Sequence, residues 1–404
     1  MSLKRTYLVA RMFARMLGRV PASHLWYLFR RMRFEKPHRT AGQVRINTFF
    51  PPYPSLAFDR FCEAVIARRR VPYSTYLAVT GRCPYACGHC SYAGRADVEM
   101  SHRQLLDVID QIKSLGTCTL GLTGGEPLLR DDLHELVAAA GPEMACIIFT
   151  TGHRLDTRRA KQLADAGVTC VTIGLESASA AEHDDVRGRT GSFVEAEAAA
   201  RACREAGIYL AISTIGTRDK FDTGDLEDMY GLATRWGAGE FRILTPIATG
   251  AWTGCQAEML LPDERLALAR FHEEHNRLPD GPAIAAFAYL ESDAVFGCGA
   301  GFHHLFIDAA GNVCPCDLTP LSFGDVTAEP LIDIWNRMAS FFPTPRRSCL
   351  MNEVARELAE CGGALPLDRA VSERICGACP PKVPLPEGYR RLVDPARGFT
   401  NPGP

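Results

Sequence analysis

The chain has 404 residues, of which 47% are hydrophobic and 23% charged, and this balance excludes a long disordered or collagen-like protein. The formal net charge of −2 gives no electrostatic reason to expect a nucleic-acid partner. No apolar run reaches the roughly 18 to 20 residues that a spanning helix needs, and the N-terminus has no signal-peptide pattern, so we expect a cytoplasmic protein. The length predicts one large domain with a smaller one appended.

Residues 1–70 predict an N-terminal helical extension. Nine lysines and arginines stand against one acid, Glu35, in residues 1–36, and apolar residues from Leu8 to Leu17 recur at helical spacing between the basic ones. A basic amphipathic helix suits peripheral contact with an anionic membrane or a partner, but a helix packed on its own barrel has the same pattern. Three prolines within 47–55 indicate a rigid connector before a helix at about 57–69.

Residues 71–290 alternate between short apolar runs and helical patterns, which is typical of parallel strands joined by crossover helices. This alternation predicts an α/β fold, a partial (β/α)6 TIM-like barrel with its chemistry at the C-terminal ends of the strands. The expected strands are 75–80, 118–123, 145–151, 168–175, 208–215 and 240–245, and the expected helices are 101–115, 130–140, 157–166, 193–206 and 224–236.

The first cysteine group follows the first expected strand. Cys83, Cys87 and Cys90 are spaced so that three thiolates can ligate three irons of a four-iron cluster, which leaves one iron open for a chelating ligand. A zinc knuckle is the alternative, but it needs a fourth local ligand. Five other cysteines stand alone among apolar or helical residues, where a thiol usually acts as a small hydrophobe: Cys62, Cys118, Cys146, Cys170 and Cys203.

Residues 291–404 predict a small cysteine-rich domain. Residues 305–307 and Val313 read as the arms of a β-hairpin with its turn at 310–312, which would bring Cys298 and Cys316 together. A CxxC pair follows at Cys376 and Cys379. Four such thiolates suit either zinc or an iron–sulfur cluster.

The segment CPYACGHC resembles the CxxxCxxC signature of the radical S-adenosylmethionine (radical SAM) superfamily, and LTGGEPLLR after the second expected strand strengthens that resemblance. The resemblance implies that Cys83, Cys87 and Cys90 hold a [4Fe-4S] cluster that binds S-adenosylmethionine. It also implies a cofactor rim around that cluster, with Arg187 meeting the cofactor carboxylate unless it is merely a helix-surface arginine. The implied cofactor-binding residues are Gly124, Gly125, Glu126, Thr151, Glu176, Ser177, Arg187 and Ser213.

The C-terminal cysteines resemble the twitch and SPASM extensions of the same superfamily, because Gly311 to Cys316 matches their Gly-x4-Cys element. This resemblance implies that one auxiliary [4Fe-4S] cluster is held by Cys298, Cys316, Cys376 and Cys379. A second auxiliary cluster from Cys314, Cys349 and Cys361 stays open.

The family implies an enzyme that cleaves S-adenosylmethionine reductively to a 5′-deoxyadenosyl radical and abstracts hydrogen from a substrate. The auxiliary cluster favours net oxidation or bond formation, with Asp317 as a catalytic proton acceptor. A peptide maturase and a lipid- or sugar-modifying epimerase remain alternatives, as does a non-enzymatic electron-transfer or zinc-binding module. The expected partners are a reductant such as flavodoxin or ferredoxin and a small-molecule, peptide or lipid substrate.

Overall fold

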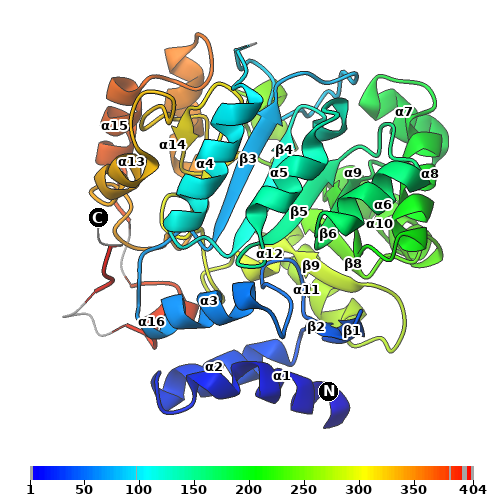
Figure 1. The fold of residues 1–404 in the computed structure, drawn as a ribbon, viewed down its shortest axis with the longest axis horizontal. Helices are drawn as coiled ribbons and strands as arrows, with labels where there is room; N and C mark the ends of the chain where they lie inside the picture. The colour runs from blue at the N-terminus through cyan, green and yellow to red at the C-terminus, as the bar shows by residue number, and fades with distance from the viewer. Residues whose placement is uncertain (1–2, 97, 382–383, 394–397, 402–404) are drawn as a thin grey trace.

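The computed structural model describes residues 3–96, 98–381, 384–393 and 398–401, and a nine-stranded sheet forms its centre (Figure 1). The strand order is β11-β10-β3-β4-β5-β6-β7-β8-β9, and every pair is parallel except β10 with β11. The six expected strands are confirmed as β3 to β8. The bounds are β3 (Ser74–Thr80), β4 (Thr119–Gly124), β5 (Ala145–Thr150), β6 (Cys170–Gly174), β7 (Leu210–Ile215), β8 (Glu240–Leu244), β9 (Ala283–Ala286), β10 (His304–Ile307) and β11 (Val313–Cys314).

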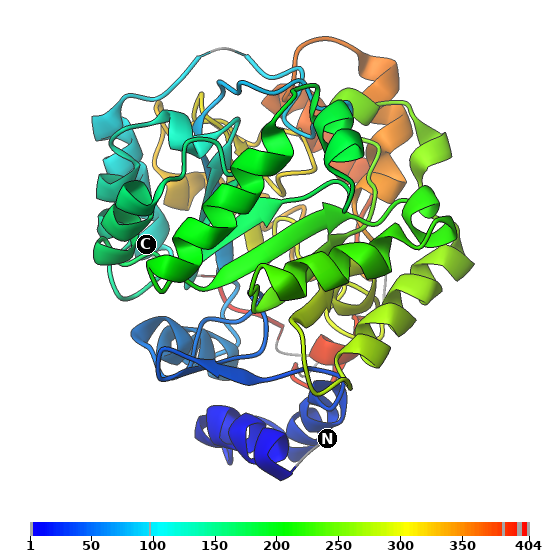
Figure 2. The same ribbon diagram turned by 90° about the vertical axis from the view of Figure 1, so that its right-hand side faces the viewer.

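Helices cover the outer face of this sheet, so the fold is an α/β partial barrel (Figures 1 and 2). Some of the crossover helices begin at side-chain caps that the sequence supplies: the capping box of Ser101 with Gln104 for α4, and the Asp156 cap for α6. Their bounds are α4 (His102–Ser114), α5 (Leu133–Ala140), α6 (Thr157–Asp165), α7 (Ala180–Arg187), α8 (Ser192–Glu205), α9 (Arg218–Asp222), α10 (Asp225–Arg235), α11 (Pro262–His275) and α12 (Phe287–Leu290), with short 3-10 turns η2 (Pro127–Leu129), η3 (Gly250–Trp252) and η4 (Gln256–Glu258).

The sheet is wider than the six strands expected. β9 extends it beyond β8, and β10 pairs in parallel with β3, with His304 opposite Ser74. The predicted hairpin is confirmed, since Ile307 pairs with Val313, but its first arm also joins the barrel. The run from Leu305 to Ile307 is apolar on both faces, and such a strand is buried best inside a parallel sheet.

The N-terminal extension holds two helices where a single one was expected. α1 (Leu3–Phe13) and the turn η1 (Ala14–Met16) lead into α2 (Ala22–Met32), followed by the short hairpin β1 (His38–Thr40) and β2 (Gln43–Arg45), then α3 (Leu56–Ile66). The α1–α2 pair lies at one end of the molecule in both views (Figures 1 and 2). Its inner side chains are buried in one cluster with those of α3: Leu8, Met12, Phe13, Met16, Phe58 and Phe61. Packing on the protein itself therefore explains one face of this pair.

Buried polar contacts join the extension to the barrel. Glu35 accepts a hydrogen bond from Asn47 Nδ2 at 3.0 Å and lies 3.3 Å from His272 Nε2 on α11. Thr48 donates to Glu240 Oε1 on β8 at 2.7 Å. These groups are nearly inaccessible to water, so the connector has a fixed position at the N-terminal end of the strands.

The C-terminal helices pack beside the first half of the barrel and the extension (Figure 1). They are α13 (Leu331–Met338), α14 (Met351–Cys361), α15 (Arg369–Ala378) and α16 (Glu387–Arg390). Among the described residues, no helix is both long and apolar enough to cross a membrane.

Arg70 joins the barrel to the C-terminal region. Its guanidinium stacks on Trp335 at 4.0 Å and donates to the carbonyls of Phe342, Trp335 and Gly301 at 2.9, 3.0 and 2.6 Å. We expect Arg70→Ala to lower the free energy of unfolding by about 3 kcal/mol, because three buried carbonyls lose their donors. Denaturant unfolding measures this loss. Arg356, whose side chain is 83% exposed, is the matched control, and an equal effect of Arg356→Ala would contradict the assignment.

Candidate active site

The expected cluster cysteines lie in the loop after β3, at the C-terminal end of the sheet. All three thiols are free, Cys83 is exposed, and Cys87 and Cys90 are half-buried. The atoms packed on the inner side of Cys83 raise the pKa of its thiol to about 11, and the nearby Cys87 and Cys90 add to the rise. Arg187 Nη1 lies 3.6 Å from Cys87 Sγ. Three free thiols in one short loop, one of them 3.6 Å from a cation, fit a metal cluster whose binding releases the thiol protons, because ligated cysteines are thiolates.

Two glycines at the end of β4 allow close contact with this loop. A Cβ on Gly124 would lie 2.1 Å from the Thr80 carbonyl oxygen, and one on Gly125 would lie 2.1 Å from that of Arg82. Gly124 also has a φ of +126°, which disfavours any other residue. The Gly125 and Glu126 amides each donate to this backbone at 2.8 Å. The glycines therefore fix the position of the cysteine loop against β4.

Glu126 connects the ends of β4 and β5 and is fully buried. Its carboxylate accepts from Thr150 Oγ1 at 2.6 Å, from the Thr151 amide at 2.8 Å and from Thr151 Oγ1 at 2.6 Å. The Leu128 amide donates to it at 2.9 Å. The structure thus brings Glu126 and Thr151 together, as parts of one hydrogen-bonded brace below the cysteine loop.

Glu176 and Arg187 form a buried ion pair. Arg187 Nη2 lies 2.8 Å from Glu176 Oε1, and His89 Nε2 lies 3.4 Å from the same oxygen. Lys220 Nζ lies 3.9 Å from the other oxygen. Burial opposes the charged form, but Arg187 above all, with the hydrogen bond from His89 and the Lys220 ammonium, holds the pKa of Glu176 well below its usual range. Arg187 is only 8% exposed, so the surface-arginine alternative is wrong.

The two predicted serines differ in their surroundings. Ser177 Oγ donates to Glu182 at 2.7 Å and to Asp225 at 3.0 Å, so it fastens α7 to α10. Ser213, on β7, lines the central cavity. Sequence reasoning missed Lys220, because α9 follows a glycine-containing turn with no motif.

In the second cysteine group, the neighbours of Cys298 differ from those expected. Cys298, Cys316 and Cys349 line one wall of a cavity, and a hydrogen bond between the thiols of Cys298 and Cys349 lowers the pKa of Cys298 and raises that of Cys349. Cys349 was expected only as a possible ligand of a second auxiliary cluster, with Cys314 and Cys361, and not beside Cys298. Cys349 reaches Cys298 because the backbone of Arg346, three residues earlier, pairs with that of Cys298.

The predicted CxxC pair lies at the end of α15. Burial raises the pKa of Cys376 to about 12; the Arg346 charge opposes this rise and the neighbouring Cys379 adds to it. The Arg346 guanidinium donates to the Cys379 carbonyl, and its backbone pairs with Cys298 in both directions, at 2.8 and 3.0 Å. Arg346 therefore bridges the CxxC pair and the Cys298 wall.

The remaining cysteines lie in separate environments. Cys314 is buried on β11, 3.9 Å from Arg95 Nη1, and Cys361 is exposed beside Arg374. The five cysteines expected to fill the core are all buried and at most 1% exposed, as predicted: Cys62, Cys118, Cys146, Cys170 and Cys203.

A cavity of about 300 Å³ runs between the barrel and the second cysteine group. Its barrel wall includes Thr123, Ser213 and Thr245, at the C-terminal ends of three strands. Its other walls include Cys298, Cys316 and Cys349. A ligand in this space would contact the second cysteine group and would extend toward the C-terminal ends of the strands, where the Cys83 loop begins.

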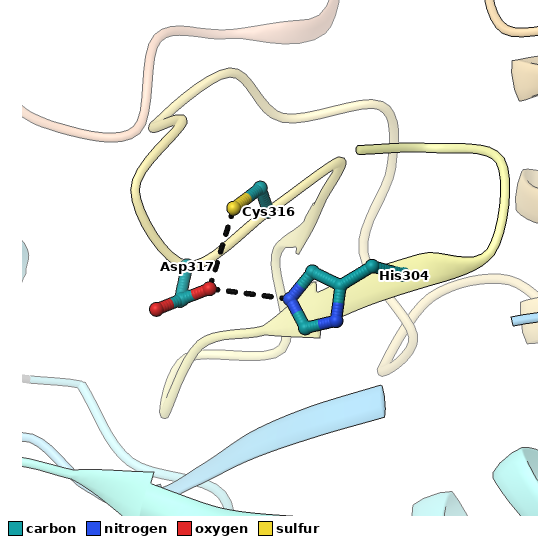
Figure 3. A group of neighbouring side chains, drawn as sticks. All are labelled: His304, Cys316 and Asp317. Atoms are coloured by element: carbon teal, nitrogen blue, oxygen red, sulfur yellow. Dashed lines mark hydrogen bonds and ion pairs between the residues drawn. The ribbon is translucent and has the colours of Figure 1, made fainter. Parts of the chain in front are cut away.

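Asp317 lines this cavity and interacts with its neighbours (Figure 3). Its Oδ1 lies 3.2 Å from His304 Nε2 and 3.3 Å from Cys316 Sγ, and Ser74 Oγ lies 2.8 Å from His304 Nδ1. Burial opposes ionisation, but His304 holds the pKa of Asp317 below its usual value. Asp317 is thus an ionised acceptor facing the cavity.

The barrel, the three-thiol loop and the auxiliary thiols together define a radical SAM enzyme. A family model described as "Radical SAM superfamily" matches residues 77–232, and one described as "Iron-sulfur cluster-binding domain", the SPASM model, matches residues 298–350. The chain is a radical SAM enzyme with a C-terminal SPASM/twitch auxiliary domain, and it depends on S-adenosylmethionine and [4Fe-4S] clusters.

Curated relatives share about a quarter of their residues with this chain. A "PqqA peptide cyclase" of Streptomyces rochei is 29% identical over 356 residues, 82% of this chain and 94% of the relative. An "AdoMet-dependent heme synthase" of Nitratidesulfovibrio vulgaris is 26% identical over 333 residues, 74% of this chain and 85% of the relative. Both relatives are named as enzymes.

Solved structures share the fold. The structure titled "Native anSMEcpe with bound AdoMet" has a TM-score of 0.55 at 16% identity, covering 76% of this chain and 96% of that one. Streptococcus suis SuiB, in a complex titled as bound to precursor peptide SuiA, has a TM-score of 0.55 at 15% identity, covering 69% of each chain.

Proposed function

We propose that the enzyme carries out a net oxidation or bond formation on a substrate held in the central cavity. The observation that carries this proposal is the cavity itself, which connects the C-terminal ends of the strands with the wall of Cys298, Cys316 and Cys349. A substrate there would be within reach of both cysteine groups. The proposed domain division, 71–290 and 291–404 after the extension 1–70, places one cysteine group in each unit.

In this proposal Cys83, Cys87 and Cys90 hold the S-adenosylmethionine-binding cluster, and Cys298, Cys316, Cys376 and Cys379 hold the auxiliary one. Cys349 is a further candidate ligand, since its thiol is hydrogen-bonded to that of Cys298. When bound, the first cluster and S-adenosylmethionine supply a radical that takes hydrogen from the substrate, and the auxiliary cluster supplies an electron acceptor.

The residues of the chain supply positioning and proton transfer. Gly124, Gly125, Glu126 and Thr151 hold the cysteine loop in place and, with Ser177 and Ser213, border the cofactor. The Glu176–Arg187 pair places a cation beside Cys87 and toward the cofactor carboxylate. Asp317 accepts the proton that the substrate loses.

Asp317→Asn tests the proton-transfer role. We expect substrate turnover to fall by about 10²- to 10⁴-fold, because the amide cannot accept the proton, while 5′-deoxyadenosine formation without substrate persists. Chromatography of both products measures the two rates. Asp333→Asn, at an exposed position on α13, is the control, and unchanged turnover in Asp317→Asn would remove Asp317 from the mechanism.

The experiment that tests the whole proposal is anaerobic reconstitution with iron and sulfide, followed by reduction in the presence of S-adenosylmethionine. We expect 5′-deoxyadenosine together with iron in excess of one four-iron cluster per chain. Iron for a single cluster would contradict the auxiliary site, and the absence of 5′-deoxyadenosine would contradict the proposal.

The cellular setting belongs to the same proposal. All sixteen cysteines are free, which supports a reducing compartment such as the cytoplasm. The exposed Cys83 loop lets a flavodoxin or ferredoxin approach. A peptide substrate is the second candidate, favoured by the similarity to an enzyme named as a PqqA peptide cyclase.

A further inference from the structure

The outer face of the α1–α2 pair exposes large apolar side chains. Tyr7 is 62% exposed, Leu17 67%, Trp26 60% and Phe29 37%. Trp26 and Phe29 stack, with their ring centroids 5.9 Å apart. Several large apolar side chains exposed together are typical of an interaction surface, because burying them against an apolar partner is favourable.

Basic residues accompany this apolar face. Arg15 and Arg19 pair with Asp59 and Glu63 of α3, whereas Arg11, Arg30 and Arg33 are exposed among the apolar side chains. Residues 1–36 carry nine basic residues and one acid, Glu35; Glu35 and Lys36 are both buried, so the exposed charge of this segment is basic. This charge is complementary to an anionic lipid surface, and the combination with aromatic side chains is typical of helices that lie in a membrane interface.

The inner face of the same helices closes the central cavity. Phe13, Met16 and Leu28 line it from the extension, together with Phe61 and Val65 of α3. His24 is the polar member of this wall, and burial lowers its pKa to about 4, so its ring is neutral. The extension end of the cavity is therefore mainly apolar and uncharged.

The barrel end of the same cavity is polar. Arg242 lies there, with its guanidinium 5.3 Å from the Phe287 ring and 5.5 Å from the Phe149 ring, and Asp317, His304 and Ser213 line the same space. The cavity thus changes from polar beside the second cysteine group to apolar beside the helices that carry the exposed aromatic face. A ligand that matches both ends has a polar head and an apolar chain.

We propose that the substrate is an amphiphile whose apolar chain lies against Phe13, Met16 and Leu28, and that the enzyme takes it from an anionic bilayer on which α1 and α2 dock. This inference rests on the function proposed above, because it assigns the substrate class of the same cavity. The same two helices contact the lipid surface with one face and the chain of the substrate with the other.

Vesicle sedimentation tests the docking. We expect the full-length protein to bind phosphatidylcholine vesicles containing phosphatidylglycerol and to bind pure phosphatidylcholine much more weakly. The double variant Trp26→Ala/Phe29→Ala should bind about tenfold more weakly, since two interfacial side chains are lost. Val194→Ala/Leu261→Ala removes apolar side chains that are 64% and 59% exposed elsewhere, and should leave binding unchanged. Equal binding to both vesicle types, or by both double variants, would overturn the docking.

A fluorescent fatty acid, cis-parinaric acid, tests the cavity. We expect saturable binding that Met16→Trp weakens about tenfold by filling the apolar end, whereas Leu17→Trp, at the exposed neighbouring position, has no effect. A photoactivatable diazirine phospholipid gives a second measurement on the unaltered protein. Cross-links at Met16 or Leu28 support the proposal, and cross-links confined to Trp26 and Phe29 overturn the assignment of the cavity.

The same preparation separates this inference from the proposed function. If 5′-deoxyadenosine forms without lipid but neither vesicles nor parinaric acid bind, the radical chemistry stands and the amphiphile is excluded. If lipid binds as expected but no 5′-deoxyadenosine forms, the proposed function fails while the lipid site stands.

Discussion

Replacing Cys87 by alanine should reduce 5′-deoxyadenosine formation below about a thousandth of the wild-type rate. The Cys87 thiol is one of only three in the loop after β3, and it is the one beside Arg187, at 3.6 Å. With two thiols left, the loop can no longer hold a cluster by three corners. Anaerobic reconstitution, iron analysis and product chromatography measure the loss.

The control for this prediction is Cys203→Ala. Cys203 is buried on α8 in the main apolar core, so its loss removes a small hydrophobe and no ligand. We expect full activity, with a free energy of unfolding lower by about 1 kcal/mol. A Cys87→Ala protein that binds one full cluster in the loop and makes product would contradict the proposed ligand set.

Arg187→Met should lower the free energy of unfolding by about 3 to 5 kcal/mol, because it leaves the buried carboxylate of Glu176 without its nearest counter-charge. It should also weaken cluster retention, since the cation beside Cys87 is lost. Denaturant unfolding of the apoprotein measures the first effect, and iron content after gel filtration measures the second. Arg158→Met, at an exposed position on α6, is the matched control.

The pH dependence supplies a second test of this pair. In the wild type the pKa of Glu176 is held low, so its contribution to stability is present at neutral pH and is lost as the pH falls through that low pKa. In Arg187→Met the pKa of Glu176 rises, because burial remains and one cation is gone. The stability difference between the two proteins should therefore narrow on acidification. A stability difference that stays constant with pH would contradict the assignment. In a double-mutant cycle, adding Glu176→Gln to Arg187→Met should restore most of the lost free energy of unfolding.

Much of the barrel could be predicted because its signals are local. Each of β3 to β8 is a mainly apolar run followed by a helix; the Cys83 motif follows β3, and the Gly124 motif begins at the end of β4. Pairings between distant segments could not be predicted. His304 lies opposite Ser74, 230 residues earlier in the chain. The short apolar run from Leu305 to Ile307 does not predict which strand it pairs with.

The candidate site shows the same division. The spacing of Cys83, Cys87 and Cys90 alone predicts a metal cluster, so these ligands can be identified from the sequence. Cys349 has no nearby motif, and it meets Cys298 only because the backbone around Arg346 pairs with Cys298. Lys220 reaches Glu176 from a five-residue helix that the periodicity does not reveal. The split of the N-terminal pattern into α1 and α2 follows from the Gly18 and Pro21 turn between two amphipathic stretches.

The pairing of β10 with β3 has a mechanical consequence. β10 pairs in parallel with β3, and β11 runs back along β10, so Cys316 lies near the Ser74 end of β3 while Cys83 lies beyond Thr80 at its other end. The length of β3, and no flexible tether, therefore sets the separation of the two cysteine groups. A fragment cut before residue 300 would leave β3 as an open edge, prone to pair with other chains, so the two halves must fold as one cooperative unit.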